Sequence, residues 1–122
     1  MTAAGFNNVI EPLGVVVAIT PVTNPTSTVI YKALMNLKAR NAMVLCAHPS
    51  AAKSSKEALR ILHDAAVSAG APPGILSAPE EMISKEEISY LMRHPKTAIV
   101  WATGGADMVR AAKAAGKHGS LV

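Results

Sequence analysis

The stretch Leu13–Thr20 reads LGVVVAIT, and the chain continues as PVTNP to Pro25. An unbroken apolar run rich in β-branched residues is typical of a parallel strand that is buried on both faces. Asn24 followed by Pro25 is a typical helix start, because asparagine caps an N-terminus and proline suits the first helical position. This stretch therefore predicts a buried strand, a turn and a helix, in that order.

Strands and helices alternate along the rest of the sequence. Short apolar runs predict the further strands Ala42–Cys46, Ile75–Ser77, Thr97–Ala102 and one that opens at Ser120. Apolar residues spaced three and four apart predict helices between them; these start near Asn24, Ser50, Ser84 and Gly105 and end near Arg40, Gly70, Arg93 and Gly116. In the first helix, the residues that we expect to face inward are Val29, Ile30, Ala33, Leu34 and Leu37.

The short connections favour right-handed crossovers and a parallel sheet. The predicted fold class is α/β: a Rossmann-like, doubly wound parallel sheet of about five strands with helices on both faces. Residues 1–12 show little periodicity and are expected to form an irregular lead-in to a domain over residues 13–122. Because the last predicted strand stops at Val122, we expect an incomplete domain that is a segment of a longer protein.

The composition is that of a small globular domain and excludes several classes of protein. The chain has 122 residues, of which 50% are hydrophobic and one is a cysteine, so no internal disulfide can form. No apolar run approaches the roughly 20 residues that span a bilayer, and no secretory signal precedes the first strand. The net charge of +4 is spread over predicted helix surfaces without interleaved exposed aromatic residues, so we expect no nucleic-acid partner.

Residues suited to binding and catalysis follow three of the predicted strands, and ligands of doubly wound sheets bind at such carboxyl ends. Asn24 offers an amide that can donate to a developing oxyanion, or it only caps the helix. His48 and Ser50 can bind a ribose or a phosphate, or they are a loop histidine and a helix-capping serine. Thr103-Gly104-Gly105 lets the backbone approach a phosphate at a helix start, or it is an ordinary tight turn.

Conventional catalytic and nucleotide motifs are absent. No G-x-G-x-x-G follows the first strand and no P-loop occurs, and the sequence offers no Ser/His/Asp set and no metal-ligand spacing. Cys46 follows the apolar residues Met43–Leu45, which predicts a buried and inert thiol.

Several blocks, taken in order, resemble one family. PLGVVVAITPVTNPTSTVIYKAL, Pro12–Leu34, is similar to the start of the nucleotide-binding domain of acylating, coenzyme A-dependent aldehyde dehydrogenases. That family includes the aldehyde dehydrogenase half of bifunctional alcohol/aldehyde dehydrogenases and the propionaldehyde dehydrogenases. Further similar blocks follow in the same order: Arg40–Ala42, Ala47–Pro49, Ala69–Pro72, His94-Pro95, and Ala102–Gly105 with Met108-Val109.

The resemblance implies that residues 13–122 are a segment of an NAD(P)-binding domain. Asn24 matches the asparagine that helps to form the oxyanion hole, and it is the catalytic residue implied for this segment. The implied cofactor-binding residues are Pro21, Val22, Thr23, His48, Pro49, Ser50, Thr103, Gly104 and Gly105. The family's nucleophilic cysteine lies downstream in a separate catalytic domain, and Cys46 does not match it.

The implied parent enzyme oxidises an aldehyde to an acyl-CoA, reversibly, with coenzyme A as co-substrate. NAD is its implied cofactor, with NADP as the alternative. We expect the parent to be a homo-oligomer with no membrane partner, in the cytoplasm or in a bacterial microcompartment. Two alternatives remain: a segment of a non-acylating aldehyde or semialdehyde dehydrogenase, and a non-catalytic nucleotide-binding or interaction module. Val22-Thr23-Asn24 and Ala102–Gly105 favour the acylating family over the first alternative, which usually has P-W-N and F-T-G-S there.

The purified 122-residue chain is expected to have no aldehyde dehydrogenase activity, because the covalent step needs a thiolate nucleophile that Cys46 does not supply. The measurement is NADH production from an aldehyde and coenzyme A; detectable turnover would contradict the prediction. As a control, Cys46→Ser in a longer parent enzyme should leave the rate nearly unchanged.

Overall fold

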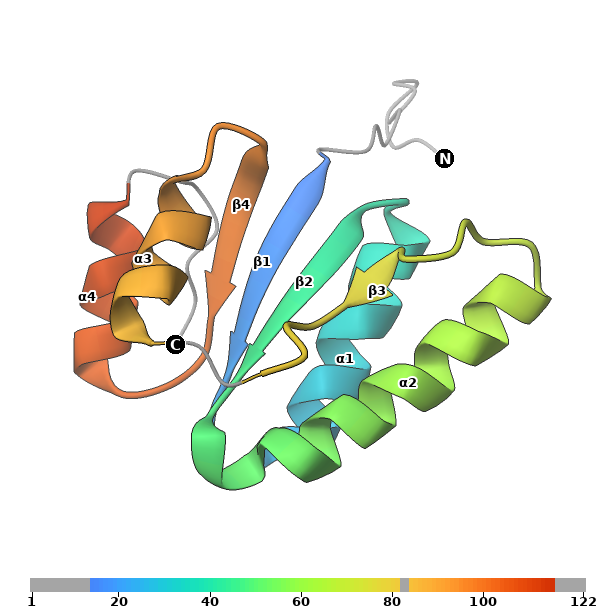
Figure 1. The fold of residues 1–122 in the computed structure, drawn as a ribbon, viewed down its shortest axis with the longest axis horizontal. Helices are drawn as coiled ribbons and strands as arrows, with labels where there is room; N and C mark the ends of the chain where they lie inside the picture. The colour runs from blue at the N-terminus through green and yellow to red at the C-terminus, as the bar shows by residue number, and fades with distance from the viewer. Residues whose placement is uncertain (1–13, 82–83, 116–122) are drawn as a thin grey trace, which may run out of the picture.

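The computed structural model of the protein describes residues 14–81 and 84–115 (Figure 1). Its elements, in chain order, are β1 (Val15–Thr20), α1 (Pro25–Lys38), β2 (Ala42–Ala47), the 3-10 turn η1 (Pro49–Ala51), α2 (Ala52–Ser68), β3 (Leu76–Ser77), α3 (Lys85–Arg93), β4 (Thr97–Ala102) and α4 (Ala106–Ala114). The expected lead-in at 1–12 and the strand expected from Ser120 lie outside the described residues. No helix in the described ranges is long and apolar enough to cross a membrane.

The sheet has the order β3-β2-β1-β4, and every neighbouring pair is parallel. Figure 1 shows α1 and α2 on one side of this sheet and α3 and α4 on the other. The chain winds outward from β1 through β2 to β3, then crosses back to add β4 on the opposite side of β1. The predicted doubly wound α/β fold is therefore confirmed, with four strands in the described residues, and the winding changes direction between β1 and β4.

Side chains of the central strand β1 enter both hydrophobic layers. Val17 and Ile19 pack in a cluster with Met92 of α3 and Ala112 of α4. Ala18, on the opposite face, packs with a second group that comprises Val29, Ala33, Met43, Leu45, Leu59 and Leu76. Burial on both faces explains why β1 contains no polar residue before Thr20.

The helix α1 is rotated relative to the prediction. Ile30 and Leu34, expected inside, are 41% and 52% exposed. The buried positions instead form the stripe Val29, Lys32, Ala33 and Asn36, which has the spacing of one helix face. Both polar residues in this stripe are hydrogen-bonded: the Lys32 Nζ donates to Ile19 O and Trp101 O, and the Asn36 Nδ2 donates to Lys32 O. These bonds allow Lys32 and Asn36 to lie on the buried face of the helix, where hydrophobicity alone would place Ile30 and Leu34.

Helix ends follow the sequence signals at the start of α3 and at the end of α2, and depart from them before α2. The capping box at α3 is confirmed, since the Ser84 Oγ accepts from Glu87 N and the Glu87 Oε1 accepts from Ser84 N, both at 3.1 Å. Gly70 has a φ of 110° just past the end of α2, as expected for a helix-terminating glycine. The second helical segment, however, is capped by His48 and not by Ser50, because the His48 Nδ1 accepts from Ser50 N.

Ser84→Ala is expected to lower the free energy of unfolding by about 1 kcal/mol, because the backbone N–H of Glu87 loses its acceptor. Chemical denaturation of the two proteins measures the difference. Glu87→Gln is the matched control, since glutamine also completes a capping box. If Ser84→Ala is no less stable than Glu87→Gln, the capping interaction does not contribute as described.

Candidate functional site

A cavity of about 740 Å³ lies at the carboxyl ends of the strands. The loops after β1, β2 and β4 all line it, and they supply every predicted site residue except Ser50: Pro21, Val22, Thr23, Asn24, His48, Pro49, Thr103, Gly104 and Gly105. Segments that are far apart in sequence therefore meet at one edge of the sheet. The volume is within the range of about 300–1,000 Å³ that is usual for small-molecule sites.

The cavity lies where the direction of winding changes. β1 is paired with β2 on one side and β4 on the other, so the loop after β1 separates the His48 loop from the Thr103 loop. After β1 the chain continues into α1, and after β4 it continues into α4, and these two helices cover opposite faces of the sheet (Figure 1). Ligands of doubly wound sheets bind at this kind of position.

Asn24 occupies the N-cap position of α1, but its side chain makes no capping bond. The Asn24 Oδ1 accepts a hydrogen bond of 3.2 Å from the Thr23 hydroxyl instead. The Asn24 carbonyl accepts from the hydroxyls of Ser27 and Thr28. Among the described residues, the Asn24 Nδ2 donates no hydrogen bond, and the residue lines both the main cavity and a second hollow of about 400 Å³. Asn24 therefore holds the N-cap position without the side-chain capping bond that the alternative interpretation expects.

The His48 loop is exposed at the rim of the cavity. The His48 Nδ1 accepts from Ser50 N at 3.1 Å, which leaves Nε2 of the ring for another partner. His48 and Pro49 line the cavity, whereas Ser50 does not. The structure thus brings His48 to the predicted site and places the Ser50 side chain outside its lining.

The turn at Thr103 joins the end of β4 to the start of α4. Thr103 N donates to Ile19 O at 2.9 Å and holds the turn against the end of β1. A Cβ atom added to Gly105 would meet nothing within 4 Å, and one added to Gly104 would make only an ordinary contact with Met108. The protein itself therefore leaves space over both glycines, and that space lies at the N-terminus of α4, where backbone N–H groups favour an anion.

A buried hydroxyl also fits a polar ligand. Thr20, the last residue of β1, is 2% exposed and lines the cavity, yet its Oγ1 has no hydrogen-bond partner in the described structure. Unsatisfied buried hydroxyls are uncommon in folded proteins. Together with the open glycine turn and the helix N-terminus, Thr20 makes the donor set suitable for the phosphates and ribose of a nucleotide.

Lys32 is the main residue near the site that sequence reasoning missed. It is 1% exposed, and its Nζ donates to Ile19 O and Trp101 O, both at 2.9 Å. The Nζ also lies 5.2 Å from the centroid of the Trp101 ring. Burial lowers the pKa of the Lys32 amine from 10.5 to about 7. A neutral amine has two N–H donors, which matches the two carbonyl acceptors.

Two further lysines line the cavity without having been predicted. Lys56 on α2 and Lys85 at the start of α3 lie on it, as does the exposed carboxylate of Glu81. In the sequence these residues belong to the polar surfaces of predicted helices and loops. Their spacing carries no signal, because only the fold brings the three segments together.

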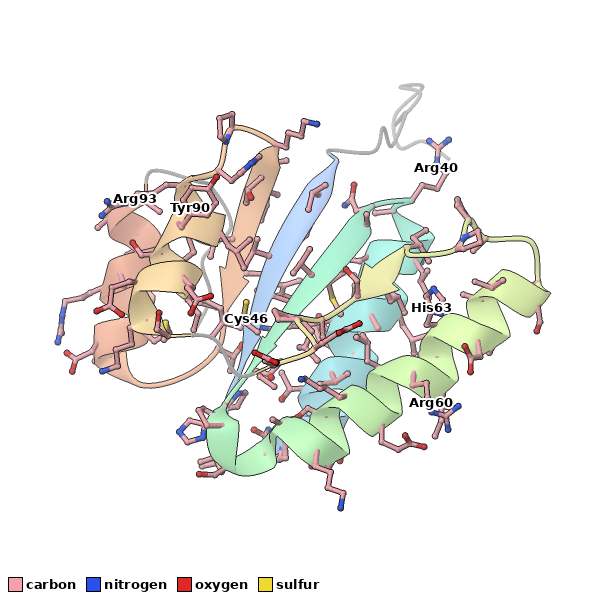
Figure 2. The ribbon with its side chains drawn as sticks, viewed as in Figure 1. Arg40, Cys46, Arg60, His63, Tyr90 and Arg93 are labelled. Carbon is pink, nitrogen blue, oxygen red and sulfur yellow. The ribbon has the colours of Figure 1, made fainter. Side chains whose placement is uncertain are left out.

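Cys46 has the environment of an inert thiol. It is 4% exposed and packs with Met92, Val100 and Ala102, and burial raises the pKa of its thiol to about 11. Figure 2 shows that Cys46 lies over the sheet and that His63 lies apart from it on α2. The His63 Nε2 accepts a hydrogen bond from Gly74 N. Within residues 14–81 and 84–115, no group of His, Cys, Asp and Glu side chains could hold a metal ion.

A sequence model of the aldehyde dehydrogenase family matches residues 4–121. The chain belongs to the aldehyde dehydrogenase family. A curated aldehyde-alcohol dehydrogenase from Streptococcus pneumoniae is 50% identical to this aldehyde dehydrogenase segment over 113 residues, which are 93% of this chain and 13% of that protein. The chain thus spans only a small part of such relatives.

Solved structures of acylating aldehyde dehydrogenases superimpose closely on the chain. An acetylating aldehyde dehydrogenase from Geobacillus thermoglucosidasius has a TM-score of 0.85 at 48% identity, over 90% of this chain and 24% of that one. A propionaldehyde dehydrogenase from Rhodopseudomonas palustris has a TM-score of 0.83 at 35% identity, over 91% of this chain and 25% of that one. These relatives confirm the resemblance to the acylating enzymes and the Rossmann-like fold.

The pKa of Lys32 predicts a pH-dependent stability. Between pH 7 and 10.5 the unfolded chain holds the Lys32 proton and the folded chain does not. The free energy of unfolding therefore rises with pH in this window, by at most about 1.4 kcal/mol per pH unit, and this stabilisation is lost as the pH falls toward 7.

Lys32→Met removes this titration, so the stability difference between wild type and variant should change with pH. Urea unfolding at several pH values from 7 to 10 measures that difference. Lys38→Met, at an exposed position of the same helix, controls for the loss of one charge. A wild-type-to-Lys32→Met difference that is constant over the whole window would show that Lys32 keeps an ordinary pKa in the fold.

Proposed function

We propose that this chain is the nucleotide-binding segment of an acylating aldehyde dehydrogenase, which oxidises an aldehyde to an acyl-CoA with NAD(P)⁺ and coenzyme A and also runs in reverse. The observation that carries the proposal is the position of Asn24. Its Nδ2 is not hydrogen-bonded within the described residues, and Asn24 lines both the main cavity and the second hollow. A cofactor in one and a reacting carbonyl in the other would meet at this amide.

The related structures support the choice of cofactors. The Rhodopseudomonas palustris propionaldehyde dehydrogenase was solved with bound CoA and an acylated cysteine. An engineered glycolyl-CoA reductase, 34% identical to this chain, was solved with bound NADP⁺. One related propionaldehyde dehydrogenase comes from a bacterial microcompartment. For the parent enzyme we accordingly propose NAD(P) and coenzyme A. The family resemblance is the basis on which we also propose a cytoplasmic or microcompartment location and a homo-oligomeric state.

The proposal assigns a role to several residues that line the cavity. The Asn24 amide donates to the oxygen that becomes negatively charged when a nucleophile adds to the substrate carbonyl, because donors placed in advance stabilise such charge. Thr103, Gly104 and the first N–H groups of α4 face the anionic part of the nucleotide, and His48 with Pro49 lies against its ribose. When bound, the nicotinamide accepts a hydride from the substrate. The thiol nucleophile comes from elsewhere in the parent enzyme.

In a full-length enzyme that contains this segment, Asn24→Ala should lower kcat by on the order of 10²–10³, as loss of an oxyanion donor does. Its stability should change little, because the side chain makes no capping bond. Steady-state kinetics and denaturation measure the two effects. Thr26→Ala, an exposed position of the same turn of α1, is the matched control.

Asn24→Asp sharpens the test. Aspartate has nearly the shape of asparagine but places an acceptor and a negative charge beside the developing oxyanion, so kcat should fall at least as far as in Asn24→Ala. Cofactor dissociation constants should change less than kcat in both variants. A folded Asn24→Asp enzyme with nearly normal kcat would overturn the role given to Asn24.

A further inference from the structure

We propose that Lys56 and Lys85 form a subsite for a phosphate monoester on the ribose of an adenine nucleotide. Coenzyme A carries this group on its ribose 3′ oxygen, NADP⁺ carries it on the 2′ oxygen, and NAD⁺ lacks it. The inference rests on the proposed function, because an adenine nucleotide must enter the cavity for its ribose to reach the two lysines. It adds to that function a determinant of which nucleotides bind.

Lys56 is fixed at the wall of the cavity. It lies one turn after Ala52 on α2, and both residues line the cavity. Its Nζ donates to Glu80 O at 3.0 Å, which links α2 to the segment between β3 and α3. The ammonium group has three donors, so two remain for a ligand. The half-buried side chain is therefore partly ordered before any ligand binds, which lowers the entropic cost of binding.

Lys85 reaches the same cavity from another element. It is the first residue of α3, and the capping box of Ser84 and Glu87 fixes the start of that helix. Two lysines from separate elements thus line one cavity, and Glu81, also on its lining, offsets one of their charges. A phosphate monoester carries a charge of about −1.5 to −2 at pH 7, so it gains from two lysines more than a single hydroxyl would.

The residues after β2 fit the same preference. In many NAD-specific sites a carboxylate near the end of the second strand binds the 2′ hydroxyl of the ribose and repels a phosphate there. Here the segment after β2 reads AHPSAAKSSK from Ala47 to Lys56 and contains no acidic residue. The lining of the cavity also includes the apolar residues Leu45, Pro79, Ile88 and Met108, which suit contact with an adenine ring. Apolar base contacts beside a cationic rim are the features that a phosphorylated adenosine requires.

The test is isothermal titration of the purified protein with three probes that share one adenosine: 5′-AMP, adenosine 2′,5′-bisphosphate and adenosine 3′,5′-bisphosphate. The expected result is that at least one bisphosphate binds about tenfold more tightly than AMP, as charge-assisted hydrogen bonds provide. Lys56→Gln and Lys85→Gln should each remove most of this preference and leave AMP binding nearly unchanged. Lys53→Gln, an exposed lysine of α2 outside the cavity lining, controls for net charge.

The outcomes separate the two proposals. A preference for the 3′ probe assigns the subsite to coenzyme A, and a preference for the 2′ probe assigns it to NADP⁺; either supports the inference. If AMP and both bisphosphates bind equally, or if Lys53→Gln weakens the bisphosphates as much as the other variants do, the subsite is wrong and nucleotide binding stands. If none of the three probes binds, the proposed function itself fails together with the subsite.

Discussion

The hydrogen bonds of the Lys32 amine are the interaction on which the geometry of this sheet edge depends. The Nζ joins Ile19 O at the end of β1 to Trp101 O at the end of β4, the two strands between which the winding changes direction. Beyond these strand ends the chain turns toward helices on opposite faces of the sheet, so the backbone pairing of β1 with β4 does not continue past Thr103 N. The Lys32 amine adds a side-chain link between the two strand ends. Without it, both carbonyl oxygens would lose a donor, and Ile19 O would keep the N–H of Thr103.

The fixed strand ends hold the short loops that line the cavity. Asn24, His48 and Thr103 each lie within a few residues of a strand, so the rigidity of the sheet extends almost to these side chains. The donors gathered there differ in kind: a side-chain amide, an imidazole, a buried hydroxyl and the N–H groups of a helix start. Such variety suits a ligand with several chemically distinct parts better than it suits a simple anion.

The order of elements and the edge that carries the site could be read from the sequence, because both follow from local patterns. LGVVVAIT has the composition of a doubly buried strand, and S-x-x-E at Ser84 is a local capping signal. The rotation of α1 could not be read, because it depends on Lys32 bonding to carbonyls from β1 and β4, one of which lies 69 residues away in sequence. Lys56, Glu81 and Lys85 were missed for the same reason: each is an ordinary surface residue until the fold brings three segments together. A ring nitrogen of His48, and not the side chain of Ser50, caps the 3-10 turn η1, and capping rules based on serine and asparagine do not predict this.

The buried thiol at the end of β2 has a chemical consequence for any electrophile that enters the cavity. Because burial raises the pKa of the Cys46 thiol to about 11, the group is protonated at neutral pH, and the thiolate is the reactive form. Electrophiles that reach the cavity wall therefore meet a group that does not react with them. A cysteine at this position can therefore fill space in the core without forming adducts with reactive molecules that enter the cavity.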